Sequence, residues 1–134
     1  MKKQVSFQTY SYFYKNAQQC TNKENFIEDV MSLDYNDWAI GYSADEINDI
    51  LNYIYELAHC SIAALREKLG LTKVAMADIY ITSKRTLLAW EKGERQISDM
   101  DRLLISYTVF TDVSYAPDSI YIILEEEFTC GLVL

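Results

Sequence analysis

Two adjacent cations, Lys84 and Arg85, are the residues of this chain whose type and position most suggest a binding chemistry. They directly follow Ser83, which is well suited to cap a helix, so both fall in the first turn of an expected helix. Cations there oppose the helix dipole, at a cost of about 0.3–1 kcal/mol each. A nucleic-acid phosphate or a guanine edge would compensate that cost. Two solvated surface cations are the alternative.

Three short helices are expected to position this pair. The first carries Leu65 on its apolar face and ends at Gly70, and Thr72 caps the second. Ser83 caps the third helix, which ends at Gly93. A glycine suits the left-handed position after a helix, so both glycines are natural stops.

The connection between the second and third helices is very short, since only Ile81 and Thr82 lie between them. Two helices joined so tightly must cross at a steep angle, which is the helix-turn-helix arrangement. Leu87 and Trp90 lie three residues apart and should face the interior. The outward face of the third helix would then carry Lys84, Arg85, Leu88 and Ala89.

Residues 65–98 resemble the Cro/Xre-type helix-turn-helix of phage repressors and related regulators. The matching residues are Leu65, Arg66, Leu69, Gly70, Leu71, Thr72, Met76, Ala77, Ser83, Thr86 and Leu87, with residues 90–95 (WEKGER) as the most specific part. The resemblance covers about a quarter of the chain. It implies an all-α fold, in which a phage-repressor-like helix-turn-helix core carries additional N-terminal helices and a C-terminal helix or short strand.

The resemblance also implies roles for single residues at a DNA duplex. Lys73 would touch the DNA backbone from the start of the second helix, and Lys92 and Arg95 would flank the groove. The recognition helix, residues 83–91, would enter the major groove. Its residues expected at or beside the base edges are Ser83, Lys84, Arg85, Leu88 and Ala89.

Two further features of the family concern the stability of the core. Arg66 and Glu91 would form its buried ion pair, and loss of one partner would cost about 3–5 kcal/mol. The family usually has glycine where this chain has Ile81, at a left-handed turn position. A β-branched residue there costs about 1–2 kcal/mol, so either the turn differs in shape or the recognition helix is tilted.

The chain is expected to have three parts. Residues 1–60 would form a helical extension packed on the core, residues 61–112 the helix-turn-helix core, and residues 113–134 a C-terminal segment that could serve dimerisation. Half of the residues are hydrophobic and 24% are charged, which is typical of a globular domain of this length.

Capping motifs predict the helices before the core. Thr21 with Glu24 and Ser43 with Glu46 form capping boxes, and the helix that begins at Thr21 should end near residue 34. Residues 43–69 could be one bent helix or two. Residues 4–16 are aromatic-rich and fit either a helix or a strand, with a helix slightly favoured.

A further helix, capped by Ser98, is expected after the core. Pro117 suits the first turn of another helix, although a strand over residues 120–124 is a close rival. The apolar residues 131–134 suggest a dimerisation surface. The inner face of the helix that begins at Ser98 would carry Met100, Leu103, Leu104 and Tyr107.

The net charge of −8 opposes DNA binding at first sight, but the charge is unevenly distributed. Residues 1–60 hold 4 Lys and Arg against 9 Asp and Glu, a net −5. Residues 61–95 hold 7 against 4, a net +3, and residues 96–134 hold 1 against 7, a net −6. The acidic flanks would weaken non-specific attraction to phosphate, or they could form a surface that binds another protein.

No metal, cofactor or catalytic site is expected. Cys20, Cys60 and Cys130 lack metal-ligand spacing and His59 is the single histidine, so the cysteines should be reduced thiols in a cytoplasmic protein. No apolar run approaches the roughly 18 residues of a membrane span, and the N-terminus does not resemble a signal peptide. An enzyme is disfavoured because the chain has no glycine-rich phosphate loop.

Two functions remain. The first is a sequence-specific transcriptional regulator of phage or mobile-element type that binds double-stranded DNA. It is expected to be a homodimer, because one recognition helix reads too few base pairs. The alternative is an acidic protein-binding module, such as an antitoxin or a phage-borne inhibitor of a nucleic-acid-binding protein, which keeps the helix-turn-helix fold and meets its protein partner through the acidic flanks.

Overall fold

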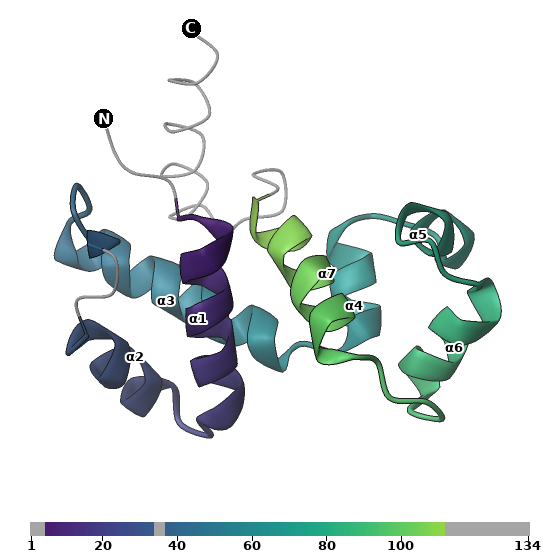
Figure 1. Cartoon of the computed structure of the whole chain (residues 1–134), viewed down its shortest axis with the longest axis horizontal. Coiled ribbons are helices and arrows are strands. Elements are labelled where there is room, and N and C mark those ends of the chain that lie inside the picture. The colour runs from purple at the N-terminus through teal and green to yellow at the C-terminus, as the bar shows by residue number, and fades with distance from the viewer. Residues whose placement is uncertain (1–4, 34–36, 112–134) are drawn as a thin grey trace, which may run out of the picture.

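The computed structural model describes residues 5–33 and 37–111. Over these residues the protein has seven helices and no strand, so the predicted all-α class is confirmed (Figure 1). In chain order they are α1 (Phe7–Gln19), α2 (Lys23–Met31), α3 (Ala44–His59), α4 (Ile62–Lys68), α5 (Lys73–Ile79), α6 (Lys84–Lys92) and α7 (Asp99–Thr111). The predictions for residues 113–134 lie outside the described residues.

Helices α1, α3 and α7 form the centre of the molecule. Helix α1 packs against α3, and α7 contacts α1, α3 and α4. Helix α2 packs against α1 and α3 at one end, whereas α5 and α6 lie at the opposite end (Figure 1). The N-terminal helices and the helices after residue 61 therefore share one continuous hydrophobic core.

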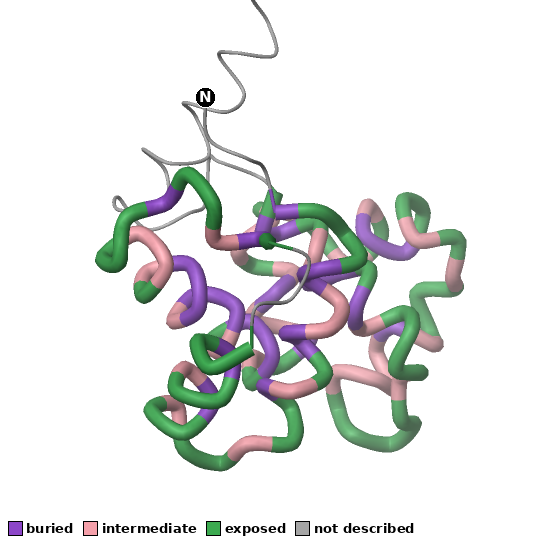
Figure 2. Tube along the Cα trace, turned by 60° about the vertical axis from the view of Figure 1, so that its left-hand side comes forward, coloured by how far each residue is buried: buried purple, intermediate pink, exposed green. Residues whose placement is uncertain are grey.

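Aromatic side chains fill the core where the three central helices meet. Tyr10 of α1 and Phe110 of α7 are buried with their ring centroids 4.9 Å apart, and Tyr53 of α3 lies 5.6 Å from Phe110. The Tyr10 hydroxyl donates a hydrogen bond to Ser106 Oγ at 3.0 Å, so its polar end is satisfied inside the protein. Figure 2 shows the buried segments gathered in this central region.

The N-terminal aromatic run forms a helix, as the sequence slightly favoured. The Ser6 hydroxyl caps α1 by accepting a hydrogen bond from Thr9 N at 3.2 Å. The helical period places its apolar side chains on one face, which packs on α3 and α7. The buried stripe consists of Tyr10, Phe13, Tyr14 and Ala17.

Helices α3 and α4 are two separate helices. Ser43 and Glu46 make both hydrogen bonds of the predicted capping box at the start of α3. Arg102 of α7 donates to the carbonyls of Ala58 and Cys60 at the end of α3. Carbonyls at a helix C-terminus have no partner within the helix, so Arg102 satisfies this end and ties α3 to α7.

The predicted start of α2 is wrong by one residue. Asn22, and not Thr21, caps the helix, and its side chain accepts a hydrogen bond from Asn25 N at 3.1 Å. Asparagine is at least as good an N-cap as threonine, so the neighbouring residue could take the role. The helix ends at Met31 rather than near residue 34.

The predicted inner face of α7 is also wrong in part. Met100 is 59% exposed and Leu104 is 42% exposed, although both were expected to face inward. Helices α1 and α3 and helix α4 all contact α7, so a different sector of its surface is covered. The residues of α7 that are buried are Leu103, Ile105, Ser106, Val109 and Phe110.

Several other features of the described residues bear on function. None of the described helices is long and apolar enough to cross a membrane. Within residues 5–33 and 37–111, no group of three or more His, Cys, Asp and Glu side chains could hold a metal ion. Cys20 and Cys60 are free and half-buried, and Cys130 lies outside the described part.

Candidate nucleic-acid interface

Helix α6 carries the two cations singled out in the sequence, and local interactions define both of its ends. The Ser83 hydroxyl accepts a hydrogen bond from Thr86 N at 3.0 Å and donates one to Thr86 Oγ1 at 2.9 Å. Gly93 ends the helix in the left-handed conformation, at φ 75°. Because the Ser83 oxygen accepts from Thr86 N and its proton is donated to Thr86 Oγ1, this hydroxyl has less to offer a base edge than the sequence suggested.

The apolar face of α6 holds it against the rest of the protein. Leu87 is fully buried and Trp90 is half-buried, as the three-residue spacing predicted. Ala77 of α5, one of the residues that carry the resemblance, is buried, and α5 contacts α6. Figure 1 shows α5 almost end-on and α6 from the side, so the two helices cross steeply.

The opposite face of α6 is open to solvent. Lys84 and Arg85 are exposed, and neither pairs with a carboxylate anywhere in the described part of the chain. Leu88 and Ala89 are half-buried between them and the end of the helix. An open hollow of about 460 Å³ lies over this face, lined by Lys84, Arg85, Leu88, Ala89, Lys92 and Glu94.

The hollow brings together five of the predicted DNA-binding residues and leaves three outside it. Lys73 is half-buried at the start of α5, and Arg95 is exposed just after α6, so neither lines the hollow. Ser83 is occupied in capping. Glu94 was not predicted, and its carboxylate places a negative charge at an otherwise cationic rim.

An ion pair anchors α6 to α4, as the resemblance implied. Arg66 Nε lies 3.2 Å from Glu91 Oε2, and Arg66 Nη2 lies 3.1 Å from Glu91 Oε1, a two-point contact. Both side chains are largely buried, at 15% and 9% exposed. Arg66 Nη1 also donates to the Leu71 carbonyl at 3.1 Å, a third hydrogen bond that the sequence did not reveal. The contact fixes the orientation of α6 relative to α4.

The turn before α6 contains an unusual backbone conformation. Ile81 has φ 52°, in the left-handed region, and its side chain is 94% exposed. The turn therefore keeps the conformation that glycine adopts in the resembled family, and a β-branched residue occupies it. At Ile81 the turn therefore does not have a different backbone shape. The left-handed conformation of this β-branched residue costs about 1–2 kcal/mol.

The single histidine, His59, is exposed at the end of α3 and contacts α1. His59 Nε2 lies 2.8 Å from the Ala17 carbonyl, and because a carbonyl can only accept, the ring nitrogen donates. The imidazole also lies 4.4 Å from the Tyr55 ring, centroid to centroid. The hydrogen bond ties the end of α3 to α1, whereas the ring contact lies within α3.

Comparison with protein-family models, with curated proteins and with solved structures found no match to this chain. The resemblance of residues 65–98 to the Cro/Xre-type helix-turn-helix therefore stays a prediction from the sequence. The geometry of α4, α5 and α6 carries the functional interpretation.

Proposed function

We propose that this protein is a sequence-specific regulator that binds double-stranded DNA, with α6 in the major groove. One observation carries the proposal: Lys84 and Arg85 are exposed in the first turn of α6 and have no carboxylate partner among the described residues. Uncompensated cations at a helix N-terminus are unfavourable in the free protein. An anionic ligand removes that penalty.

Each exposed residue of the helix suits a particular part of a duplex. Arg85 can donate two hydrogen bonds to a guanine edge, and Lys84 can contact a guanine or a phosphate. Leu88 can make apolar contact with a thymine methyl group. Lys73, Lys92 and Arg95 lie at the margins, where phosphate contacts fix the register. In this role the protein works in the cytoplasm as a homodimer on two half-sites.

The acidic remainder of the molecule shapes how such binding would behave. Residues 1–60 carry a net −5, which repels phosphate from this part of the protein. Non-specific affinity is then low, and only docking through the cationic face of α6 is favourable. Such a protein depends on correct base contacts more than a uniformly basic one does.

Selection from a genomic fragment library, followed by affinity measurements over a salt series, tests the proposal. We expect a specific site whose affinity falls steeply with salt. Arg85→Ala should cost about 1–3 kcal/mol of binding at that site. If Lys84 contacts a phosphate, Lys84→Ala should lower the salt slope by about 0.9.

Lys23→Ala is the matched control, because Lys23 also lies in the first turn of its helix but belongs to α2, at the opposite end of the molecule from α6. This variant should bind the selected site as tightly as the unmodified protein. Failure to select any site, or a selected site at which Lys84→Ala and Arg85→Ala change neither the affinity nor the salt slope, would refute the proposal.

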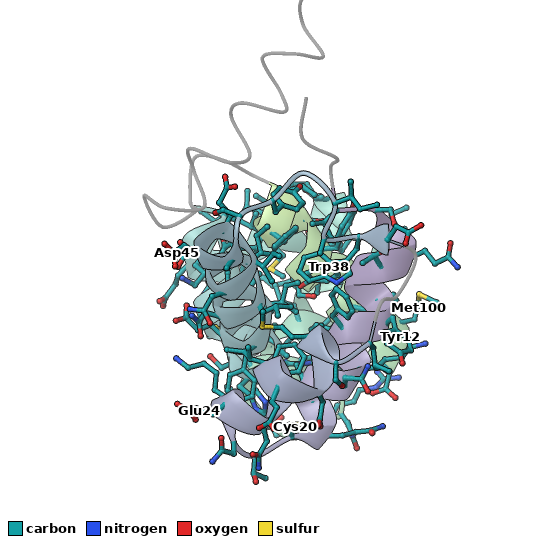
Figure 3. All side chains as sticks on the ribbon, turned by 90° about the vertical axis from the view of Figure 1, so that its left-hand side faces the viewer. Tyr12, Cys20, Glu24, Trp38, Asp45 and Met100 are labelled. Atoms are coloured by element: carbon teal, nitrogen blue, oxygen red, sulfur yellow. The ribbon has the colours of Figure 1, made fainter. Side chains whose placement is uncertain are left out.

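The acidic surface supports a second candidate function, an acidic module that binds a basic protein partner. The exposed carboxylates of α2 and α3 include Glu24 and Asp45, which project from the surface in Figure 3. An antitoxin or an inhibitor of a nucleic-acid-binding protein would use such a face. A pull-down from host lysate that recovers no stable partner would count against this function.

A further inference from the structure

An apolar stripe runs along the solvent side of α7 and continues onto α1. Met100 and Leu104 are one helical turn apart and are 59% and 42% exposed. Tyr107 follows at the next turn and contacts Phe7 of α1 edge-to-face, with ring centroids 5.0 Å apart. Figure 3 shows Met100 at the edge of the molecule, pointing away from it. The helical spacing of these apolar residues predicts burial, yet no part of the described chain covers Met100 and Leu104.

The stripe borders a groove between α1 and α7 with a volume of about 500 Å³. Buried Tyr14 and Leu103 form part of its floor. A groove of this volume can accept side chains from another helix. Its lining residues are Phe7, Ser11, Tyr14, Lys15, Gln18, Gln19, Asp99, Met100 and Leu103.

Charge indicates what could occupy the groove. Lys15 lines it from α1 and Asp99 lines it from α7; both are exposed, and neither has an ion-pair partner among the described residues. The groove is therefore locally neutral, with one charge of each sign on its two walls. A strongly basic partner would gain nothing from such a surface, whereas a copy of the same surface is complementary to it. In a two-fold contact through this groove, a pairing of Lys15 with Asp99 of the other copy would be made twice.

We propose that the α1–α7 groove is the surface through which two copies of this chain associate, with Met100, Leu104 and Phe7 at its apolar centre. This inference depends on the proposed function in one respect: association of two copies supplies the second recognition helix that two half-sites require. The association itself needs no DNA. It also assigns the contact to described residues rather than to residues 113–134.

Sedimentation equilibrium of the full chain without DNA, over a wide range of concentrations, tests this directly. We expect a reversible change from a monomer of 15.6 kDa to a dimer of twice that mass. Leu104→Glu should raise the dimer dissociation constant by at least about tenfold, because it places a charge in the apolar centre of both copies. Met31→Glu is the control, since Met31 is similarly exposed but lies on α2, away from the groove, and it should change nothing.

A charge exchange separates a direct contact from an effect on folding. Lys15→Glu and Asp99→Lys should each weaken association, by about tenfold at low salt, because each puts like charges together twice. The double variant restores opposite charges and should recover the original dissociation constant. Circular dichroism of each variant checks that the helices are intact.

A protein that stays monomeric at every concentration would overturn the inference. So would a dimer that tolerates both Leu104→Glu and the single charge reversals, because the contact would then lie elsewhere. Association without any selected DNA site would refute the proposed function and leave the groove assignment standing. Specific DNA binding by a protein that does not associate would support the proposed function and refute the groove assignment.

Discussion

At the scale of single residues, Ile81 adopts a conformation that its side chain disfavours. Its left-handed φ of 52° is a strained conformation for a β-branched residue, and its 94% exposed side chain recovers little by packing. The neighbouring interactions impose it, since Thr82 N donates to the Ala77 carbonyl at 2.9 Å and closes the turn. This strained backbone conformation directs α6 away from α5 at a steep angle.

Ile81→Gly should therefore stabilise the protein. Glycine removes about 1–2 kcal/mol of strain from the folded state. Its greater conformational freedom in the unfolded chain destabilises the folded state by about 0.5–1 kcal/mol. We expect a net gain of roughly 0.5–1 kcal/mol in the free energy of unfolding, measured by urea denaturation. Ile81→Ala keeps a Cβ atom and should gain much less. An equal gain in both variants would point to the exposed side chain instead of the backbone.

At the scale of helices, the start of each element depends on one or two side chains. Ser6, Ser43, Ser61, Thr72 and Ser83 each accept a hydrogen bond from a backbone N–H three residues later. Such contacts need no tertiary structure, and a single substitution tests them. Helix α2 offers the sharpest case, because two adjacent residues could serve as its cap.

Asn22→Ala should lower the free energy of unfolding by about 1 kcal/mol, because it leaves Asn25 N without its side-chain acceptor. Thr21→Ala should leave the free energy of unfolding nearly unchanged, since Thr21 is exposed and precedes the cap. Thermal or urea unfolding of the two variants side by side measures the difference. A larger loss for Thr21→Ala would restore the capping box expected from the sequence.

At the scale of the whole molecule, the core is unusually rich in tyrosine. Burial raises the pKa of Tyr10, and it also raises the pKa of Tyr14, Tyr80 and Tyr107, in each case because the charged form is poorly solvated. In the unfolded chain the same groups titrate near about pH 10. The folded state therefore holds protons that the unfolded state releases at alkaline pH.

The protein should lose stability above about pH 10. A tyrosine whose pKa is raised by folding contributes its full stability below the unfolded pKa, and this contribution is lost as the pH rises. Fully buried Tyr10 should steepen the fall by up to about 1.4 kcal/mol per pH unit, and half-buried Tyr80 and Tyr107 should contribute less. Urea denaturation between pH 8 and about pH 11.5, combined with tyrosinate absorbance, measures this. Tyr10→Phe should make the fall shallower, and an unchanged slope would contradict the explanation.

The sequence by itself determined where most helices begin, because a cap forms within three or four residues. The Ser43–Glu46 box and the caps at Thr72 and Ser83 are found as predicted. It also indicated the Arg66–Glu91 contact, through a resemblance that spans both residues. The exposure of Lys84 and Arg85 followed from the spacing of Leu87 and Trp90 in the same helix.

Only the tertiary structure decided which side of each helix is covered. The period of α7 fits more than one inner face, and contact with α1, α3 and α4 buries the sector of Ser106 and Phe110 while leaving Met100 outside. Arg102 likewise contacts the end of α3, which is distant in sequence. Glu94 reaches the rim of the hollow because of the turn that follows α6. Capping is a local interaction, whereas burial depends on which surfaces meet, and that choice is made by the whole chain at once.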